Sequence, residues 1–424
     1  MRQIRVQTII MGGGVGSRLF PLTKGRCKPA VPIGGKYRLV DIAISNSIHS
    51  GYNQIYLLTQ YHTRSLHRHI SETYNFDPFA GGFVEVLPAE QVDGKDHTWY
   101  EGTADAVRKN LDYINLADDD LVLILAGDHL YRMDFSAMVK AHLETNAEVT
   151  ISGKIVPSSI VRQLGVMELC PDMRIRNFEE KPSTDEQIRR LLLPREEYPR
   201  HNLDPSQAYC VASMGNYLFR FETLKHALEG NENDFGKNVL PKLLAQGTAM
   251  YTYLFDGYWE DIGSVRSFFD ANLALTDIVP PFDFFDEKHP IFTKPRYLPA
   301  SKINGCSMER VIIGDGCLID RAVLRRCVIG IRSVIRENSC LEDVLVMGNN
   351  AFEKRHTPSG PIPCGIGKNC YIRNAIIDKD SRIGDRVRLV ADGKPNGYES
   401  HGCVLVDGII CVPERTVLQD DFIF

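Results

Sequence analysis

A glycine-rich segment close to the N-terminus offers the first chemistry in the sequence. Residues 12–18 read Gly-Gly-Gly-Val-Gly-Ser-Arg, and Lys28 follows a short distance later. Because glycine has no Cβ, several backbone N–H groups of such a loop can approach one phosphate group closely. The side chains of Arg18 and Lys28 would add charge-assisted hydrogen bonds to phosphate oxygens. We therefore expect a polyphosphate site made of Gly12, Gly13, Gly14, Arg18 and Lys28.

Two better-known phosphate-binding motifs do not fit this segment. A P-loop requires G-x-x-x-x-G-K-[ST], and no Lys-Ser or Lys-Thr pair follows these glycines. The dinucleotide motif G-x-G-x-x-G, started at Gly14, meets Leu19 where a glycine is required. A simple tight turn remains the alternative interpretation of the glycines, but it does not account for the two cations.

A second segment has the groups to bind a flat base. Residues 99–107 read Trp-Tyr-Glu-Gly-Thr-Ala-Asp-Ala-Val, and Gln91 precedes them. Gly102 would allow a base to lie on the backbone, and the Gln91 amide can both donate and accept at a base edge. Thr103 is the expected N-cap of a helix over 104–114. A plain turn between strand and helix is the alternative.

Two aspartates are candidate ligands for a metal ion. Asp128 closely follows the apolar run 121–126, and Asp261 lies in the segment 257–263. An acidic residue just past a buried strand lies at the edge of a sheet, where it can hold Mg²⁺, which prefers oxygen ligands and bridges to substrate phosphates. Taken singly, each aspartate is equally well explained as a helix cap.

Residues 178–182 suit a sugar phosphate. Lys181 provides a point charge for the phosphate, and Glu180 can accept hydrogen bonds from sugar hydroxyls. Gly165 and the segment 212–217 supply small and hydroxyl-bearing groups nearby. The alternative is that these charges are simply solvated at the surface.

The elements that must position these residues alternate along the first half of the chain. The apolar runs 6–10, 55–59 and 121–126 are typical of strands, and the segments 40–48 and 135–143 have the spacing of helix faces. This alternation predicts an α/β fold with a doubly wound, mostly parallel sheet. Ligands of such sheets bind at the carboxyl ends of the strands, which is where the motifs fall.

A different pattern occupies the last third of the chain. Residues 278–300 are rich in proline and aromatic residues and predict a linker. Beyond it, an aliphatic residue recurs every six positions, as at Ile313 and Ile319 and again at Ile329 and Ile335. This repeat predicts a left-handed parallel β-helix with one shared core. The expected organisation is a catalytic domain over 1–277, a linker over 278–300 and a β-helix domain over 301–424.

Composition excludes several classes of partner. The formal net charge of −5 gives no basic footprint, which argues against nucleic acid. No apolar run approaches the roughly 18 to 20 residues of a spanning helix, and the N-terminus lacks the pattern of a signal peptide, so we expect a cytoplasmic protein without membrane contact. The 11 cysteines include no C-x-x-C pair and are interpreted as reduced, buried thiols, with a redox-regulatory pair as the alternative.

Taken together, the motifs resemble a known family. The chain is similar over nearly its whole length to the sugar-1-phosphate nucleotidyltransferases, and in particular to the ADP-glucose pyrophosphorylases of bacteria and plastids. The resemblance is carried by GGGVGSRLFPLTKGRCKPAVPIGGKYRLVDIAISNS, WYEGTADAVR, AGDHLY, LGVM, FEEKP, ASMGNYLF and YWEDIGSV. It implies a Rossmann-like nucleotidyltransferase domain, the substrates ATP and glucose 1-phosphate, the cofactor Mg²⁺ and a homotetramer.

The resemblance also implies roles for individual residues. The ATP phosphates would be held by Gly12, Gly13, Gly14, Arg18 and Lys28, and the adenine would face Gln91, Gly102 and Thr103. Glucose 1-phosphate would be bound by Tyr100, Gly165, Glu180, Lys181, Ser213, Tyr217 and Trp259. Mg²⁺ would be held by Asp128 and Asp261, and the catalytic residues would be Arg18, Lys28, Asp128 and Asp261. The phosphate of glucose 1-phosphate would attack the α-phosphorus of ATP in line, without a covalent intermediate.

The C-terminal stretches VIGIRSVI and GIGKNCYIRNAIIDKDSRIGDRV resemble the branch of that family regulated by 3-phosphoglycerate. Arg26, Arg38 and Lys379 match its anion-binding effector positions, so phosphorylated allosteric effectors are expected. Glu414 departs from this pattern, since the branch usually carries lysine there. A carboxylate at that position would repel a phosphorylated effector.

Three other functions compete with this interpretation. The chain could be a pyrophosphorylase for another nucleotide, such as dTTP or UTP. The β-helix could mark an acyltransferase, but such enzymes need a catalytic histidine on the coils, and only His356 and His401 follow the linker. The chain could also be a regulatory subunit without turnover, although the cations and carboxylates that such subunits tend to lose are all present.

Overall fold

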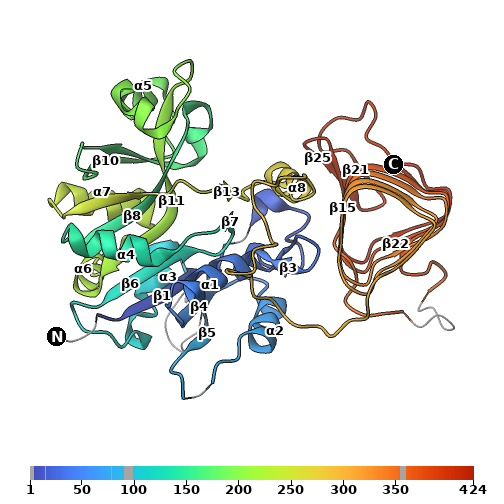
Figure 1. Cartoon of the computed structure of the whole chain (residues 1–424), viewed down its shortest axis with the longest axis horizontal. Helices are drawn as coiled ribbons and strands as arrows, with labels where there is room; N and C mark the ends of the chain where they lie inside the picture. Colours follow the sequence, from blue (N-terminus) through green and yellow to red (C-terminus); the bar gives the residue numbers. More distant parts are fainter. Residues whose placement is uncertain (1–3, 15, 78, 90–98, 354–359) are drawn as a thin grey trace.

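The computed structural model describes residues 4–14, 16–77, 79–89, 99–353 and 360–424. Figure 1 shows an α/β domain beside a coil of strands that is triangular in cross-section, with helix α8 (Val265–Ala274) next to the coil. Gln91 and residues 354–359 lie outside the described residues. Every helix among the described residues is too short or too polar to cross a lipid bilayer.

The half of the central sheet that leads into the glycine-rich segment 12–18 is parallel. Strand β1 (Val6–Met11) lies between β4 (Gln54–Thr59) and β6 (Leu121–Ala126), and both neighbours run parallel to it. Strand β5 (Phe83–Pro88) extends this half beyond β4, again in parallel. The carboxyl ends of these strands therefore share one edge, as the sequence predicted for a doubly wound domain.

The other half of the sheet is largely antiparallel. Strand β11 (Tyr209–Arg220) runs antiparallel to β6, to β9 (Gly165–Leu169) and to β8 (Val149–Pro157). Strand β10 (Ile175–Glu180) pairs antiparallel with β9, and β12 (Met250–Leu254) pairs parallel with β8. The sheet is thus mixed, and its order is β10-β9-β11-β6-β1-β4-β5 with β8 and β12 on a branch from β11.

Helices cover both faces of the sheet. Successive side chains of a strand point to opposite faces, so Ile9 and Ile10 of β1 belong to two separate apolar cores and are both almost fully buried. The remaining α-helices are α1 (Leu39–His49), α2 (Arg64–Thr73), α3 (Thr103–Arg108), α4 (Phe135–Glu144), α5 (Asp185–Arg190), α6 (Phe221–Ala227) and α7 (Leu240–Ala245).

The helix predicted over 104–114 is shorter than expected. Helix α3 ends at Arg108, and a separate short 3₁₀ turn follows at Leu111–Tyr113. Thr103 is the first helical residue and not the N-cap, which is Gly102. The cause is tertiary: the backbone carbonyl of Asn233 accepts hydrogen bonds from the N–H groups of Ala104 (2.9 Å) and Asp105 (3.3 Å), so a side-chain cap is not required.

The C-terminal strands form the β-helix that the six-residue repeat predicted. One face comprises β14 (Lys302–Asn304), β16 (Leu318–Asp320), β18 (Val334–Ile335), β20 (Gly365–Ile366), β22 (Arg382–Ile383) and β27 (Val417–Leu418). A second face comprises β15 (Ser307–Ile313), β17 (Val323–Ile329), β19 (Cys340–Val346), β21 (Tyr371–Ile377), β23 (Arg388–Leu389), β24 (Glu399–Ser400), β25 (Cys403–Val406) and β26 (Ile409–Val412).

Each repeat residue lies directly beside its counterpart in the next coil. One buried ladder of paired positions runs through Ile319, Ile335, Ile366, Ile383 and Leu418. Stacking of these side chains builds the inner core of the coil. All 11 cysteines are free thiols, and burial raises the pKa of several, such as Cys327 to about 12.

The two domains share an apolar contact. Val328 and Leu345 of the β-helix belong to the same core as Phe268 of α8 and as Leu39 of α1. Residues 275–301, which connect the domains, form neither helix nor strand. The β-helix is therefore packed against the domain that carries the phosphate-binding motif.

Candidate active site

A cavity of 580 Å³ opens where β1 and β6 end, and it collects most of the residues singled out in the sequence. The expected residues that line it are Gly13, Gly14, Arg18, Lys28, Tyr100, Gly102, Thr103, Asp128, Glu180, Lys181, Tyr217 and Asp261. Gly12, Gly165, Ser213 and Trp259 are not among the lining residues. The carboxyl edge of the parallel strands is thus the place where the motifs converge.

The glycines of the first motif differ in what surrounds them. A Cβ on Gly12 would lie 2.9 Å from the Leu58 carbonyl oxygen, so this glycine allows two backbone segments to pack closely. A Cβ on Gly14 would meet nothing within 4 Å, and Gly14 faces the cavity. The open space beside Gly14 is therefore available to a ligand, whereas Gly12 is required by packing.

The two aspartates meet through a short antiparallel pair of strands. Strand β7 (His129–Tyr131) pairs with β13 (Trp259–Asp261), and this register places Asp261 opposite His129, the neighbour of Asp128. Residues that are far apart in the sequence are thereby brought to one point in the cavity. A carboxylate oxygen of each aspartate and a ring nitrogen of His129 lie within 4.8 Å of one another.

The ammonium group of Lys28 lies close to both carboxylates and offsets part of their negative charge. Its Nζ lies 2.6 Å from Oδ2 of Asp128 and 3.5 Å from Oδ1 of Asp261. Burial alone would lower the pKa of Lys28, but the two carboxylates outweigh it and raise that pKa. Burial alone would raise the pKa of Asp128, and the charge of Lys28 lowers it. These shifts keep Lys28 and Asp128 charged at neutral pH, and the ammonium of Lys28 lies between the carboxylates of Asp128 and Asp261.

The residues expected around a base have structural partners of their own. A Cβ on Gly102 would lie 2.1 Å from the Asn233 carbonyl oxygen, so packing alone requires glycine there. The Thr103 hydroxyl accepts a hydrogen bond from the Phe235 N–H at 3.1 Å. Both residues still line the cavity, but they are held by the segment that follows α6.

The sugar-phosphate candidates lie on the opposite wall. Lys181 has a left-handed φ of 54°, and its Nζ lies 3.3 Å from Oε1 of Glu180. A Cβ on Gly165 would lie 2.8 Å from Oε2 of Glu180, so this glycine makes room for that carboxylate. Ser213 accepts a hydrogen bond from the Gly215 N–H, and burial raises the pKa of the neighbouring Tyr217.

Several residues of the cavity were not identified from the sequence. They are Gln60, Tyr61, Glu101, His129, Asp234, Phe235 and Gly236. His129 is next to Asp128 in the motif AGDHLY, and this adjacency could have identified it as a residue of the site. Gln60 contacts the site through the backbone of Tyr100, whose N–H donates to its Oε1 at 3.0 Å. No local pattern marks Asp234 or Phe235.

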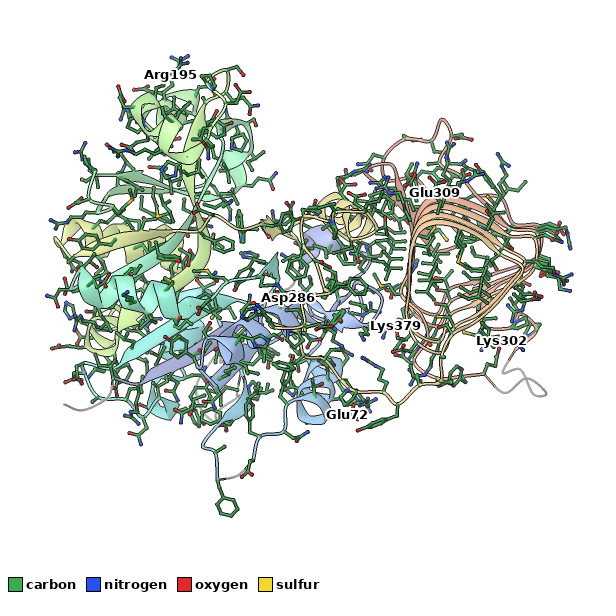
Figure 2. All side chains as sticks on the ribbon, in the orientation of Figure 1. Glu72, Arg195, Asp286, Lys302, Glu309 and Lys379 are labelled. Carbon is green, nitrogen blue, oxygen red and sulfur yellow. The ribbon has the colours of Figure 1, made fainter. Side chains whose placement is uncertain are left out.

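A second polar cluster lies at the junction of the domains and contains the expected effector residues. Arg26 is only 6% exposed and donates to Oδ1 of Asp378 at 2.9 Å and to Oε2 of Glu414 at 3.2 Å. Figure 2 shows Lys379 on the side of the β-helix that faces the α/β domain. Burial, together with the charges of Arg38 and Arg26, lowers the pKa of Lys379 to about 7.

Two family models match the chain in succession. The model described as nucleotidyl transferase matches residues 7–278, which is more than half of the chain. The model described as GLGC left-handed parallel beta-helix domain matches residues 296–423. The first match contains the whole cavity, and the second contains the stacked coils.

Proposed function

The chain belongs to the nucleotidyl transferase family, and from this we propose that it is a glucose-1-phosphate adenylyltransferase, which converts ATP and glucose 1-phosphate to ADP-glucose and pyrophosphate. This reaction would be the committed step of glycogen or starch synthesis. The observation that carries the proposal is one cavity lined both by the cations Arg18, Lys28 and Lys181 and by the carboxylates of Asp128 and Asp261. The GLGC-type β-helix supports the choice of ADP-glucose among the products of such enzymes.

The phosphates of ATP would bind at the glycine loop. The open space at Gly14 admits a phosphate group against the backbone, and Arg18 lines the same part of the cavity. Repulsion between two polyanionic substrates opposes their approach, so cations fixed in advance are the main requirement of this reaction. Losing one of them is expected to cost about 3 kcal/mol, or roughly a hundredfold in rate.

The carboxylates fit a magnesium ion. Asp128 and Asp261 offer the oxygen ligands that Mg²⁺ prefers, and the position of Lys28 between them shows that a positive charge is accommodated there. When bound, Mg²⁺ would supply charge neutralisation for the phosphate oxygens. Lys28 holds the side chains of Asp128 and Asp261 together. When a metal ion neutralises these carboxylates, the ammonium group of Lys28 would be free to contact a phosphate.

The sugar phosphate would lie between the two walls of the cavity. Lys181 would bind its phosphate, and Glu180 would accept hydrogen bonds from sugar hydroxyls. The phosphate oxygen attacks the α-phosphorus of ATP in line, and pyrophosphate leaves. Because a phosphate monoester is already an anion, no general base is required, and the side chains act by positioning and charge stabilisation.

The direct test is a pyrophosphate-release assay of the purified chain with glucose 1-phosphate, Mg²⁺ and each of ATP, dTTP and UTP. ATP is expected to support the fastest release. Faster release with dTTP or UTP would establish the alternative specificity, and no release with any nucleotide would favour a regulatory subunit. Light scattering on the same sample tests the homotetramer, which we infer from the resemblance.

Replacing Lys181 with alanine is expected to weaken the binding of glucose 1-phosphate much more than the binding of ATP. The KM for glucose 1-phosphate should rise by about a hundredfold, and the KM for ATP by less than about threefold, because a charge-assisted contact to only one substrate is lost. Lys237→Ala is a matched control, since Lys237 is exposed nearby but does not line the cavity. An equal rise for both substrates would contradict the role given to Lys181.

Regulation by phosphorylated effectors is part of the proposal, with Arg26, Arg38 and Lys379 as the binding cations. Support for Arg26 comes from a cavity of about 310 Å³ at the domain junction, which Arg26 lines together with Lys24, Glu414 and Arg415. Arg38 and Lys379 are not among its lining residues. Arg26 is already paired with Glu414, so an effector must displace this carboxylate. We therefore expect weak binding of anions such as 3-phosphoglycerate.

Replacing Glu414 with glutamine should strengthen anion binding at this junction. Glu414 carries a negative charge, as sulfate does, so its removal is expected to tighten sulfate binding beside Arg26 by about tenfold. The measurement is the shift of the melting temperature during a sulfate titration. Glu309→Gln is the control, because Glu309 is an exposed carboxylate on β15 of the same domain. Equal sulfate binding by wild type and both variants would place the effector site elsewhere.

A further inference from the structure

Strands β6 and β11 stop pairing just before the cavity. Their antiparallel ladder ends where Ile124 lies opposite Tyr217. On its other side, β6 stays paired with β1 as far as Ala126. The end of β6 therefore has a neighbouring backbone ladder on one side only, and Asp128 follows it after a single glycine.

A bulge in β11 coincides with this break. The pairing of β11 with β8 shifts its register between Ser213 and Tyr217, and Gly215 within this segment has a left-handed φ of 70°. A bulged backbone no longer presents its hydrogen-bonding groups in step with its neighbours, so part of the ladder is left without partners. The bulge thus accounts for the early end of the pairing between β6 and β11.

The side chain of Asn216 bonds to β6 where the backbone of β11 does not. Its Oδ1 accepts a hydrogen bond from the backbone N–H of Ala126 at 3.3 Å. Asn216 is fully buried and does not line the cavity, although its neighbours Gly215 and Tyr217 both do. An unpaired backbone N–H inside the protein is costly, so the amide oxygen replaces a main-chain acceptor of the ladder.

The other side of the same turn is fixed by β1. The N–H of Gly127 donates to the Met11 carbonyl oxygen at 3.2 Å, and a Cβ on Gly127 would lie 2.8 Å from that oxygen. The segment that leads to Asp128 is therefore held by a backbone contact on one side and by the Asn216 side chain on the other. Losing either support should allow the carboxylate of Asp128 to move.

We propose that Asn216 is a positioning residue, which fixes Asp128 by supplying the acceptor that the bulged strand lacks beside β6. This inference rests on the proposed function, in which Asp128 helps to hold the metal ion. Groups that orient a metal-binding side chain typically change metal affinity or activity by ten- to a hundredfold when they are removed, according to roughly the same range across metal sites. A displacement of about 1 Å in a reacting site has a similar cost.

The test is Asn216→Leu, which has a similar shape but offers no acceptor. Mn²⁺ affinity, followed by electron paramagnetic resonance, is expected to fall by about tenfold, because Asp128 is no longer held at its place beside Asp261. The kcat should fall by about ten- to a hundredfold. The KM values for ATP and glucose 1-phosphate should change by less than about threefold, since Asn216 lies outside the cavity lining.

Thr150→Val is the matched control, because it removes another buried polar contact from the same sheet. Thr150 lies on β8, away from the cavity lining, and its hydroxyl is 2.8 Å from Nδ1 of His142. Both variants should lower the melting temperature by a few degrees, but only Asn216→Leu should weaken Mn²⁺ binding. An equal loss of Mn²⁺ affinity in both variants, or no loss in Asn216→Leu, would overturn the proposal.

Asn216→Ala carries the same test if leucine prevents folding, because alanine removes the acceptor without crowding its neighbours. Failure of both variants to fold would assign Asn216 to the fold alone and would also overturn the proposal. The metal site itself is tested with Asp128→Asn. If Mn²⁺ binding were unchanged in this variant, the metal site and the inference would both fail. If it fell there but not in the folded Asn216 variants, the inference alone would fail and the proposed function would stand.

Discussion

Asp128→Asn is expected to lower kcat by about a thousandfold with little change in fold. Asparagine has the same shape as aspartate, but it removes one of the two negative charges that would hold the metal ion. It also removes the ion pair with Lys28, whose Nζ lies 2.6 Å away. The Asp128 side chain is 27% exposed, so the neutral amide remains hydrated and the domain should still fold.

The measurement is pyrophosphate release at saturating ATP and glucose 1-phosphate over a range of Mg²⁺ concentrations. A metal-site defect should be partly relieved by high Mg²⁺, whereas a folding defect should not. Asp270→Asn serves as the control, because Asp270 is an aspartate on α8 that forms an exposed ion pair with Arg266. A kcat within about tenfold of wild type would show that Asp128 does not hold the catalytic ion.

The parts of this site that the sequence predicted are those whose chemistry is local. The glycines, Arg18 and Lys28 stand within one short segment, and their residue types alone indicate phosphate binding. The β-helix was predicted for a similar reason, since the aliphatic repeat is visible in the sequence and stacking places residues of successive coils, such as Ile319 and Ile335, side by side. Local spacing was sufficient in both cases.

The parts that were not predicted depend on contacts between distant segments. Gly102 was interpreted as a platform for a base, but its lack of a Cβ is explained by the Asn233 carbonyl, which no local pattern indicates. His129 is adjacent to Asp128, but it meets Asp261 only because β7 pairs with β13. The pair of Arg26 and Asp378 joins two domains. The spacing of residues in a single sequence does not reveal which distant residues come into contact.

The antiparallel half of the sheet was not predicted, for a different reason. Strands β9 and β10 are joined by residues 170–174 only. A connection this short cannot include the crossover of a dozen or more residues that parallel neighbours need, so the two strands must be antiparallel. The alternation of strands and helices was recognised only in the segments that precede them, and the prediction of a mostly parallel sheet followed from those segments.

Gly14→Ala is the second large expected effect, because Gly14 lines the cavity and the space where its Cβ would lie is empty in the protein alone. A methyl group there would meet no protein atom within 4 Å. It would instead occupy the space proposed for an ATP phosphate. We expect kcat/KM for ATP to fall by about a hundredfold, since a displacement of about 1 Å from the reacting geometry costs that much. The melting temperature should remain that of the wild type.

Gly12→Ala is the matched comparison, because the same methyl group is added two residues earlier in the same loop. Its Cβ would lie 2.9 Å from both Leu57 Cδ1 and the Leu58 carbonyl oxygen, so overpacking should destabilise the protein by about 1–3 kcal/mol. Gly12→Ala should therefore lower the stability of the protein, whereas Gly14→Ala should lower its activity with ATP and leave its stability unchanged. If Gly14→Ala kept full activity with ATP, the triphosphate would have to bind away from this loop, and Arg18 and Lys28 would lose their proposed substrate.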